Sequence, residues 1–67
     1  MIKVNNKMFD DFLEIMGNYN EFLFGTKKEL KKQLEICLNS QGYWSGNYIR
    51  LYYDTNEKRF TIEKRWQ

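Results

Sequence analysis

The chain has 67 residues, of which 42% are apolar and 18% aromatic, and its formal net charge is +2. This length allows one domain, residues 1–67, and so short a chain buries only about 60% of its unfolded surface. The aromatic residues compensate for this small buried fraction, because each buried aromatic side chain removes roughly 150–250 Å² from water. One cysteine and no histidine exclude an internal disulfide and a Cys/His metal cluster, so no cofactor is expected.

The sequence predicts a cytoplasmic protein with no membrane partner. No apolar run approaches the ~20 residues that span a bilayer, and the N-terminus lacks the pattern of a signal peptide. The single thiol, Cys37, suits a reducing compartment and lies on an apolar helical stripe, where cysteine behaves as an inert hydrophobe.

Residues 6–16 carry apolar side chains at helical spacing with acidic residues between them. Asn5 or Asn6 can cap the first turn, and Gly17 can end the helix in the left-handed conformation. The apolar positions are Phe9, Phe12, Leu13 and Met16. The acidic ones, Asp10, Asp11 and Glu14, form a solvated cluster rather than a metal site, because adjacent carboxylates point to different sides of a helix.

An alternative for this region is a hairpin, since residues 17–20 (Gly-Asn-Tyr-Asn) are strong turn formers. Residues 11–16 and 21–26 would be its arms. The apolar residues of the first arm occur in adjacent pairs rather than alternating, which favours the helix.

The next segment, residues 21–25, is short, aromatic and bounded by turn residues, which predicts a buried strand. Thr26 then opens a second helix, because Thr26-Lys-Lys-Glu29 is a capping box. An apolar stripe carries this helix to Asn39 or Ser40. The stripe consists of Leu30, Leu34, Cys37 and Leu38.

Four lysines lie in the first turns of this second helix: Lys27, Lys28, Lys31 and Lys32. They form like-charge i,i+4 pairs near the positive end of the helix dipole, which weakens the isolated helix by roughly a few tenths of a kcal/mol per pair. They can serve an anionic ligand, or they can simply solvate the surface.

The loop at residues 41–47 places Tyr43 and Trp44 between two glycines. An exposed Trp44 would anchor a partner, whereas a Trp44 folded back would close one end of the sheet.

The last third of the chain, residues 48–66, alternates as a β-hairpin that turns through residues 54–58. The side chains predicted to face the core are Ile49, Leu51, Tyr53, Phe60, Ile62 and Trp66. The opposite face is predicted to carry Tyr48, Arg50, Tyr52, Arg59, Thr61, Glu63 and Arg65.

These elements predict an α+β fold, a small two-layer sandwich of order α-β-α-β-β. Its antiparallel sheet has three strands, with Met1–Val4 as a candidate fourth, and both helices cover one face. The other sheet face stays open.

The open face predicts a non-enzymatic protein that binds a macromolecule, with no catalytic residue. A protein partner is favoured, because Tyr, Trp and Arg dominate interface hot spots and the net charge is modest. The alternative is a nucleic acid bound through phosphate contacts and base stacking. Self-association into a homo-oligomer is a third class. The candidate partner-binding residues are Tyr48, Arg50, Tyr52, Arg59, Arg65, Trp44, Lys27, Lys28, Lys31 and Lys32.

Composition adds one analogy. Abundant Asn, Lys, Ile and Tyr are typical of AT-rich genomes, and small, aromatic-rich proteins without cofactors are common among phage and mobile-element inhibitors of host machinery. We therefore expect an inhibitor or regulator that acts by protein contact.

Overall fold

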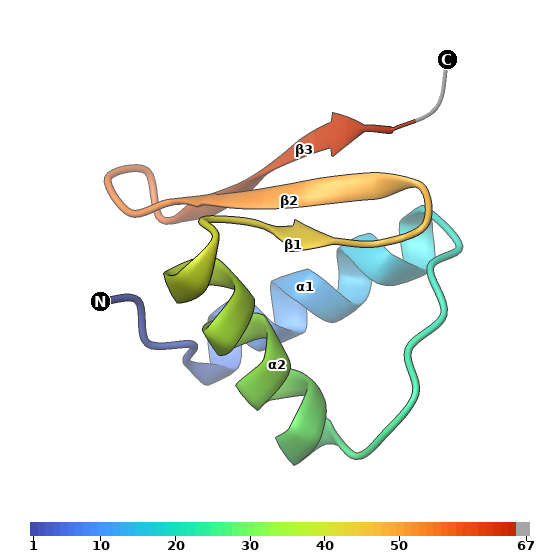
Figure 1. Ribbon diagram of the computed structural model, residues 1–67, viewed down its shortest axis with the longest axis horizontal. Coiled ribbons are helices and arrows are strands. Elements are labelled where there is room, and N and C mark those ends of the chain that lie inside the picture. Colours follow the sequence, from blue (N-terminus) through green and yellow to red (C-terminus); the bar gives the residue numbers. More distant parts are fainter. Residues whose placement is uncertain (66–67) are drawn as a thin grey trace.

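A computed structural model describes residues 1–65 as two helices followed by a three-stranded antiparallel sheet. Both helices lie on one face of the sheet, and the other face is uncovered (Figure 1). The expected α+β class with helices on one face is confirmed. The elements are α1 (Asn6–Asn18), α2 (Lys27–Ser40), β1 (Trp44–Ser45), β2 (Ile49–Asp54) and β3 (Arg59–Lys64).

The order of the elements is α-α-β-β-β, so the predicted order was wrong at two places. Residues 21–25 form no strand but a connection from α1 to α2, and the third strand is β1 instead. The connection begins at one end of the sheet, where the Glu21 side chain accepts hydrogen bonds from the backbone at residues 47–49, and runs from there to the start of α2 (Figure 1). Within residues 1–65 no strand pairs with it, so its aromatic residues do not enter a ladder.

The two helices begin where the capping signals predict. The Asn5 side chain accepts from the Met8 N–H at 2.9 Å. At α2, the Glu29 N–H donates to Thr26 Oγ1 at 3.2 Å, and the Thr26 N–H donates to Glu29 Oε1 at 2.9 Å, which completes the predicted capping box. The end of α1 differs, because the helix continues through Gly17 to Asn18 and the left-handed residue is Asn20, at φ 56°.

Met1–Val4 is not a fourth strand, because side chains of α2 bond its backbone. The Ile2 N–H donates to Asn39 Oδ1 at 2.7 Å, and the Asn39 amide donates back to the Ile2 carbonyl at 2.8 Å. The Val4 N–H donates to Glu35 Oε1 at 2.9 Å. The N-terminal segment is thus fixed along α2.

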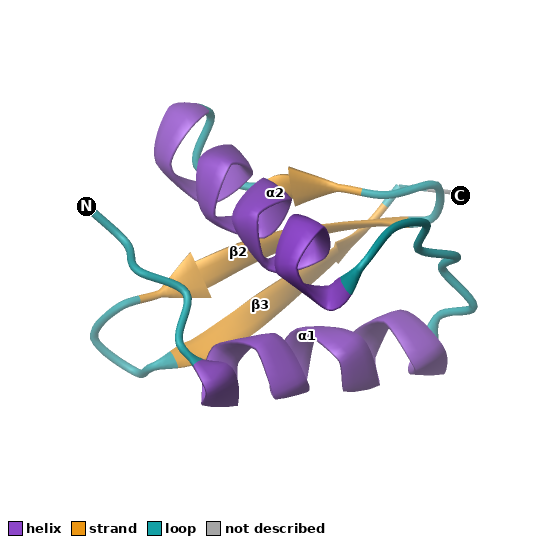
Figure 2. Ribbon diagram, turned by 90° about the horizontal axis from the view of Figure 1, so that it is seen from below, coloured by secondary structure: helices purple, strands orange, loops and turns teal. Residues whose placement is uncertain are grey.

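The predicted hairpin is present, with β2 at the centre of the sheet and register pairs Leu51↔Ile62 and Arg50↔Glu63. Ile49 and Leu51 are fully buried, while Phe60 and Ile62, the apolar residues of β3 on the core side, are half-buried. α1 packs against β3 and α2 against β1, so the helices divide one sheet face between them (Figure 2). Trp66, predicted for the core side, lies outside the described residues.

The core joins both helices to this sheet face. Phe12 of α1 is 1% exposed, and its ring meets Trp44 edge-on at a centroid distance of 5.2 Å. Trp44 therefore folds back onto the core, the second of the two predicted arrangements. Cys37 is half-buried on α2.

Candidate functional site

The uncovered sheet face holds a cluster of four interacting side chains, which we call the outer-face cluster: Tyr43, Arg50, Tyr52 and Glu63. Alternation along β2 turns Arg50 and Tyr52 away from the core, and the register places Glu63 of β3 beside Arg50. Tyr43, just before β1, joins them on the other side.

Arg50 lies at the centre of the cluster. Its guanidinium carbon is 4.8 Å from the centroid of the Tyr43 ring, a cation–π contact, and its Nη1 is 3.9 Å from Glu63 Oε1. The pKa of Arg50 is raised above its usual range. The largest cause is the hydrogen bond with the Tyr52 hydroxyl, and the charges of the Tyr43 hydroxyl and the Glu63 carboxylate add to it. The Arg50 Nε atom is covered and has no hydrogen-bond partner within residues 1–65.

The aromatic rings extend the cluster. Tyr43 and Tyr52 are tilted against each other at a centroid distance of 5.5 Å, and the Tyr52 hydroxyl is 3.5 Å from Glu63 Oε1. The four side chains thus contact one another on the open face and remain partly accessible to solvent.

Arg65 is also engaged, at the end of the hairpin beyond β3. Its Nη1 donates to Ser45 Oγ at 3.1 Å and to the Gly46 carbonyl at 2.5 Å, which ties the end of the hairpin to the β1–β2 turn. Arg59 lies at the far end of the same sheet face, opposite Asp54, and forms no ion pair within residues 1–65.

The remaining candidates do not join this face. Trp44 lies on the core side of the sheet, and the lysines are on α2, below the covered face. Lys31 donates to Asn6 Oδ1 at 3.0 Å, and Lys27, Lys28 and Lys31 line a hollow of about 540 Å³ between the helices. Tyr48 precedes β2 and lies over α1's end, where it lines a second hollow with Tyr19.

The outer-face cluster depends on a buried carboxylate. Glu21 is 7% exposed and accepts hydrogen bonds from the backbone N–H groups of Asn47, Tyr48 and Ile49 at 2.8, 2.6 and 3.2 Å. Three backbone donors satisfy the carboxylate and fix the β1–β2 turn. That turn sets the register in which Ser45 lies opposite Arg50.

Sequence reasoning missed two residues of this site, Glu21 and Tyr43. Tyr43 could have been found, because Gly46-Asn47 between Trp44 and Ile49 is a tight-hairpin signal that indicates a short strand before it, next to Tyr43. Glu21 had no such signal, since its contacts are 26 to 28 residues away along the chain.

No family model, curated protein or solved structure matches this chain.

Within residues 1–65, no group of three His, Cys, Asp or Glu side chains could hold a metal ion, and no helix combines the length and apolarity needed to cross a membrane.

Proposed function

We propose that this protein is a small, non-enzymatic binding module that contacts another protein through the open face of its sheet. The observation that carries the proposal is the outer-face cluster, in which two tyrosines and an arginine are half-exposed and already held together. These residue types dominate the energies of protein interfaces, and their preorganisation lowers the entropic cost of binding.

The contacts that Arg50 and Arg65 already make on this face favour a protein over a nucleic acid. A nucleic acid would need the arginines for its phosphates. Arg50 is stacked on Tyr43 and paired with Glu63, and Arg65 donates to Ser45 and Gly46. The Glu63 carboxylate, which is 57% exposed, would also repel phosphates lying over the cluster.

The mode of action that fits is inhibition or regulation by occupying a surface of the partner. A standard interface buries about 800 Å² per partner, and in a molecule of 32 × 27 × 20 Å such a contact would take in most of the side that carries the open sheet face. The compositional analogy to phage and mobile-element inhibitors also favours inhibition or regulation by protein contact.

Affinity capture from an extract of the source organism tests this proposal. The full chain is compared with Tyr52→Ala, Arg50→Ala and the matched control Gln33→Ala, an exposed position of α2 on the other side of the sheet. We expect one partner protein that is retained by the wild type and the control and lost with either face variant. Equal recovery by all four chains would overturn the assigned surface.

A parallel titration with single-stranded and duplex oligonucleotides addresses the alternative. Binding that falls by roughly tenfold or more between low and physiological salt, and that requires Arg50, would favour a nucleic-acid-binding protein instead.

A further inference from the structure

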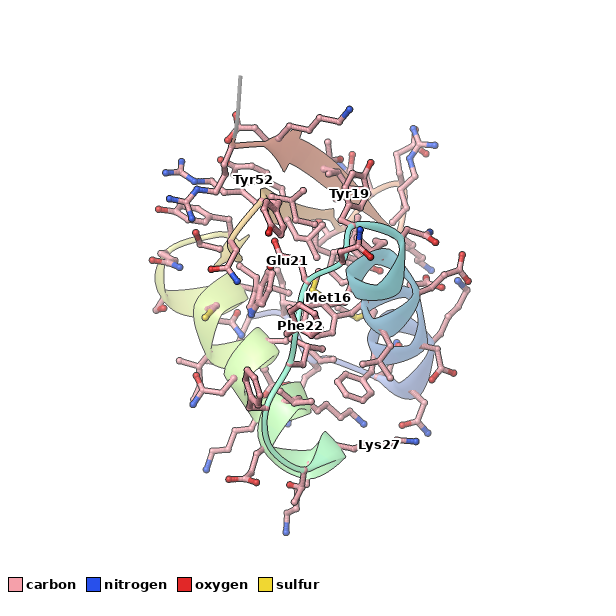
Figure 3. The ribbon with its side chains drawn as sticks, turned by 90° about the vertical axis from the view of Figure 1, so that its right-hand side faces the viewer. Met16, Tyr19, Glu21, Phe22, Lys27 and Tyr52 are labelled. Carbon is pink, nitrogen blue, oxygen red and sulfur yellow. The ribbon has the colours of Figure 1, made fainter. Side chains whose placement is uncertain are left out.

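The connection between α1 and α2 exposes two phenylalanines that the outer sheet face does not involve. Phe22 is 76% exposed and Phe24 is 88% exposed, whereas Leu23 between them packs against the core. Exposure therefore alternates along residues 22–24, and both rings point away from the core. Figure 3 shows this segment running along the side of the molecule between the two helices, with Phe22 on it.

This segment is anchored at both ends and unpaired between them. The Glu21 N–H donates to the Met16 carbonyl at 2.9 Å, and the Thr26 capping box fixes the start of α2. Among the described residues, 22–25 form no hydrogen bond. The two rings are thus held outward by a short, fixed loop.

The residues that follow are basic. Lys27 and Lys28 are exposed at the start of α2, and Lys32 is exposed one turn later. Figure 3 places Lys27 at the lower end of the segment that carries Phe22. The four lysines of α2 lie near two carboxylates, Glu29 at the start of the helix and Asp10 across the hollow between the helices, so positive charge remains in excess.

We propose that this Phe/Lys tip, defined as Phe22, Phe24, Lys27 and Lys28, docks on the surface of an anionic lipid bilayer. Exposed aromatic rings insert at the boundary between headgroups and acyl chains, and neighbouring lysines bind the anionic headgroups. The expectation of no membrane partner rested on the lack of a spanning segment, and a surface contact needs none. The inference is independent of the proposed function of the sheet face.

Charge and residue type favour lipid over a protein at this tip. Phenylalanine occurs at both kinds of contact, but lysine is depleted from protein interfaces, where arginine is enriched, and every basic residue of the tip is lysine. A second copy is disfavoured, because symmetric pairing of two tips would bring their lysines together.

Co-sedimentation with lipid vesicles tests the proposal with the full chain. The vesicles consist of phosphatidylcholine alone or of phosphatidylcholine mixed with phosphatidylserine, each at low and at physiological ionic strength. The variants are F22S/F24S, K27Q/K28Q and the control I36S, which removes an apolar side chain that is 47% exposed on α2. Thermal unfolding of each variant checks that it folds.

We expect binding to the anionic vesicles that weakens with salt and is at least about tenfold weaker for F22S/F24S. K27Q/K28Q should bind several-fold less and lose part of the salt dependence, and I36S should bind as the wild type does. Two results would overturn the proposal: no binding to anionic vesicles at low salt, or equal binding by F22S/F24S. A dimer seen by light scattering that requires Phe22 and Phe24, without vesicle binding, would assign the tip to a second copy instead.

Discussion

The Glu21 carboxylate accepts a hydrogen bond from the backbone N–H of Tyr48 at 2.6 Å, across 27 residues of chain. Two neighbouring N–H groups donate to the same carboxylate. This contact links the helix connection to the sheet, because the turn it holds sets the pairing of β1 with β2. The arrangement of Tyr43 beside Arg50 on the open face follows from that pairing.

Replacing Glu21 should therefore destabilise the protein more than any other single surface-loop change. Glu21→Ala leaves three backbone donors without their acceptor, and we expect a loss of about 2–4 kcal/mol in the free energy of unfolding. Glu21→Gln should lose less, because it keeps one acceptor oxygen. Urea unfolding measures both, with Glu14→Ala on the exposed side of α1 as control. Equal stability of the Glu21 and Glu14 variants would refute the role of the carboxylate.

A methyl group at residue 46 should also be harmful. A Cβ on Gly46 would lie 2.5 Å from Glu21 Oε2 and 2.7 Å from Trp44 Cζ3. Both neighbours are packed, so Gly46→Ala should cost about 1–3 kcal/mol. Gly17→Ala is the matched control, since nothing lies within 4 Å of its added Cβ, and within α1 it should stabilise by roughly 0.5–1 kcal/mol. Thermal unfolding measures the stability of both variants. If both were more stable than the wild type, or both less stable, the result would contradict the structure.

Trp44 is predicted to act in the core rather than at an interface. Trp44→Ala removes the ring that meets Phe12 edge-on, and truncation of a packed aromatic costs about 3–5 kcal/mol, close to the whole stability of so small a domain. Trp44→Phe should recover part of this loss. Circular dichroism and thermal unfolding check the result. A folded Trp44→Ala protein with lost partner binding would instead place Trp44 at the contact.

Acid should weaken the start of α2. Bonds from the Thr26 backbone and hydroxyl lower the pKa of Glu29 below its usual 4.5. The contribution of Glu29 is therefore complete above pH 4.5 and is lost as the pH falls through the lower, folded-state value. Glu29→Gln keeps the capping geometry without the charge, so its stability should fall less than that of the wild type on acidification. Unfolding at neutral pH and well below pH 4.5 measures this, with Glu14→Gln as control.

The outer-face cluster is predicted to matter for binding and little for stability. The Arg50–Glu63 pair is 3.9 Å apart and both side chains are more than a third exposed, so water screens much of their attraction. Arg50→Ala should unfold close to the wild-type midpoint, in contrast to Trp44→Ala. A large loss of stability in Arg50→Ala would show that the cluster stabilises the fold.

Local signals explain which parts of this fold could be predicted from sequence. The Asn5 cap, the Thr26 capping box and the alternation of β2 and β3 each act within a few residues, and each was predicted. Residues 21–25 were misjudged because their aromatic content is typical of a buried strand, whereas their position follows from Glu21 bonding a turn far along the chain. β1 has two residues, too few for a periodic signal.

The candidate site, like the fold, could be predicted from sequence only where local signals determine it. Alternation assigned Arg50 and Tyr52 to the open face without reference to distant residues. The contribution of Tyr43 depends on the β1–β2 turn, which the local Gly46-Asn47 signal indicates. The separation of the α2 lysines from that face depends on how the helices pack under the sheet, a tertiary relationship that no local pattern encodes.

Hydrogen exchange of the captured complex tests the central claim most directly. With the partner bound, amides of Arg50, Tyr52 and Glu63 on the open sheet face should gain protection relative to the free protein, while α2 should not change. Protection confined to the helices or to residues 22–28, with β2 and β3 unaffected, would contradict the assignment of the open sheet face as the binding surface.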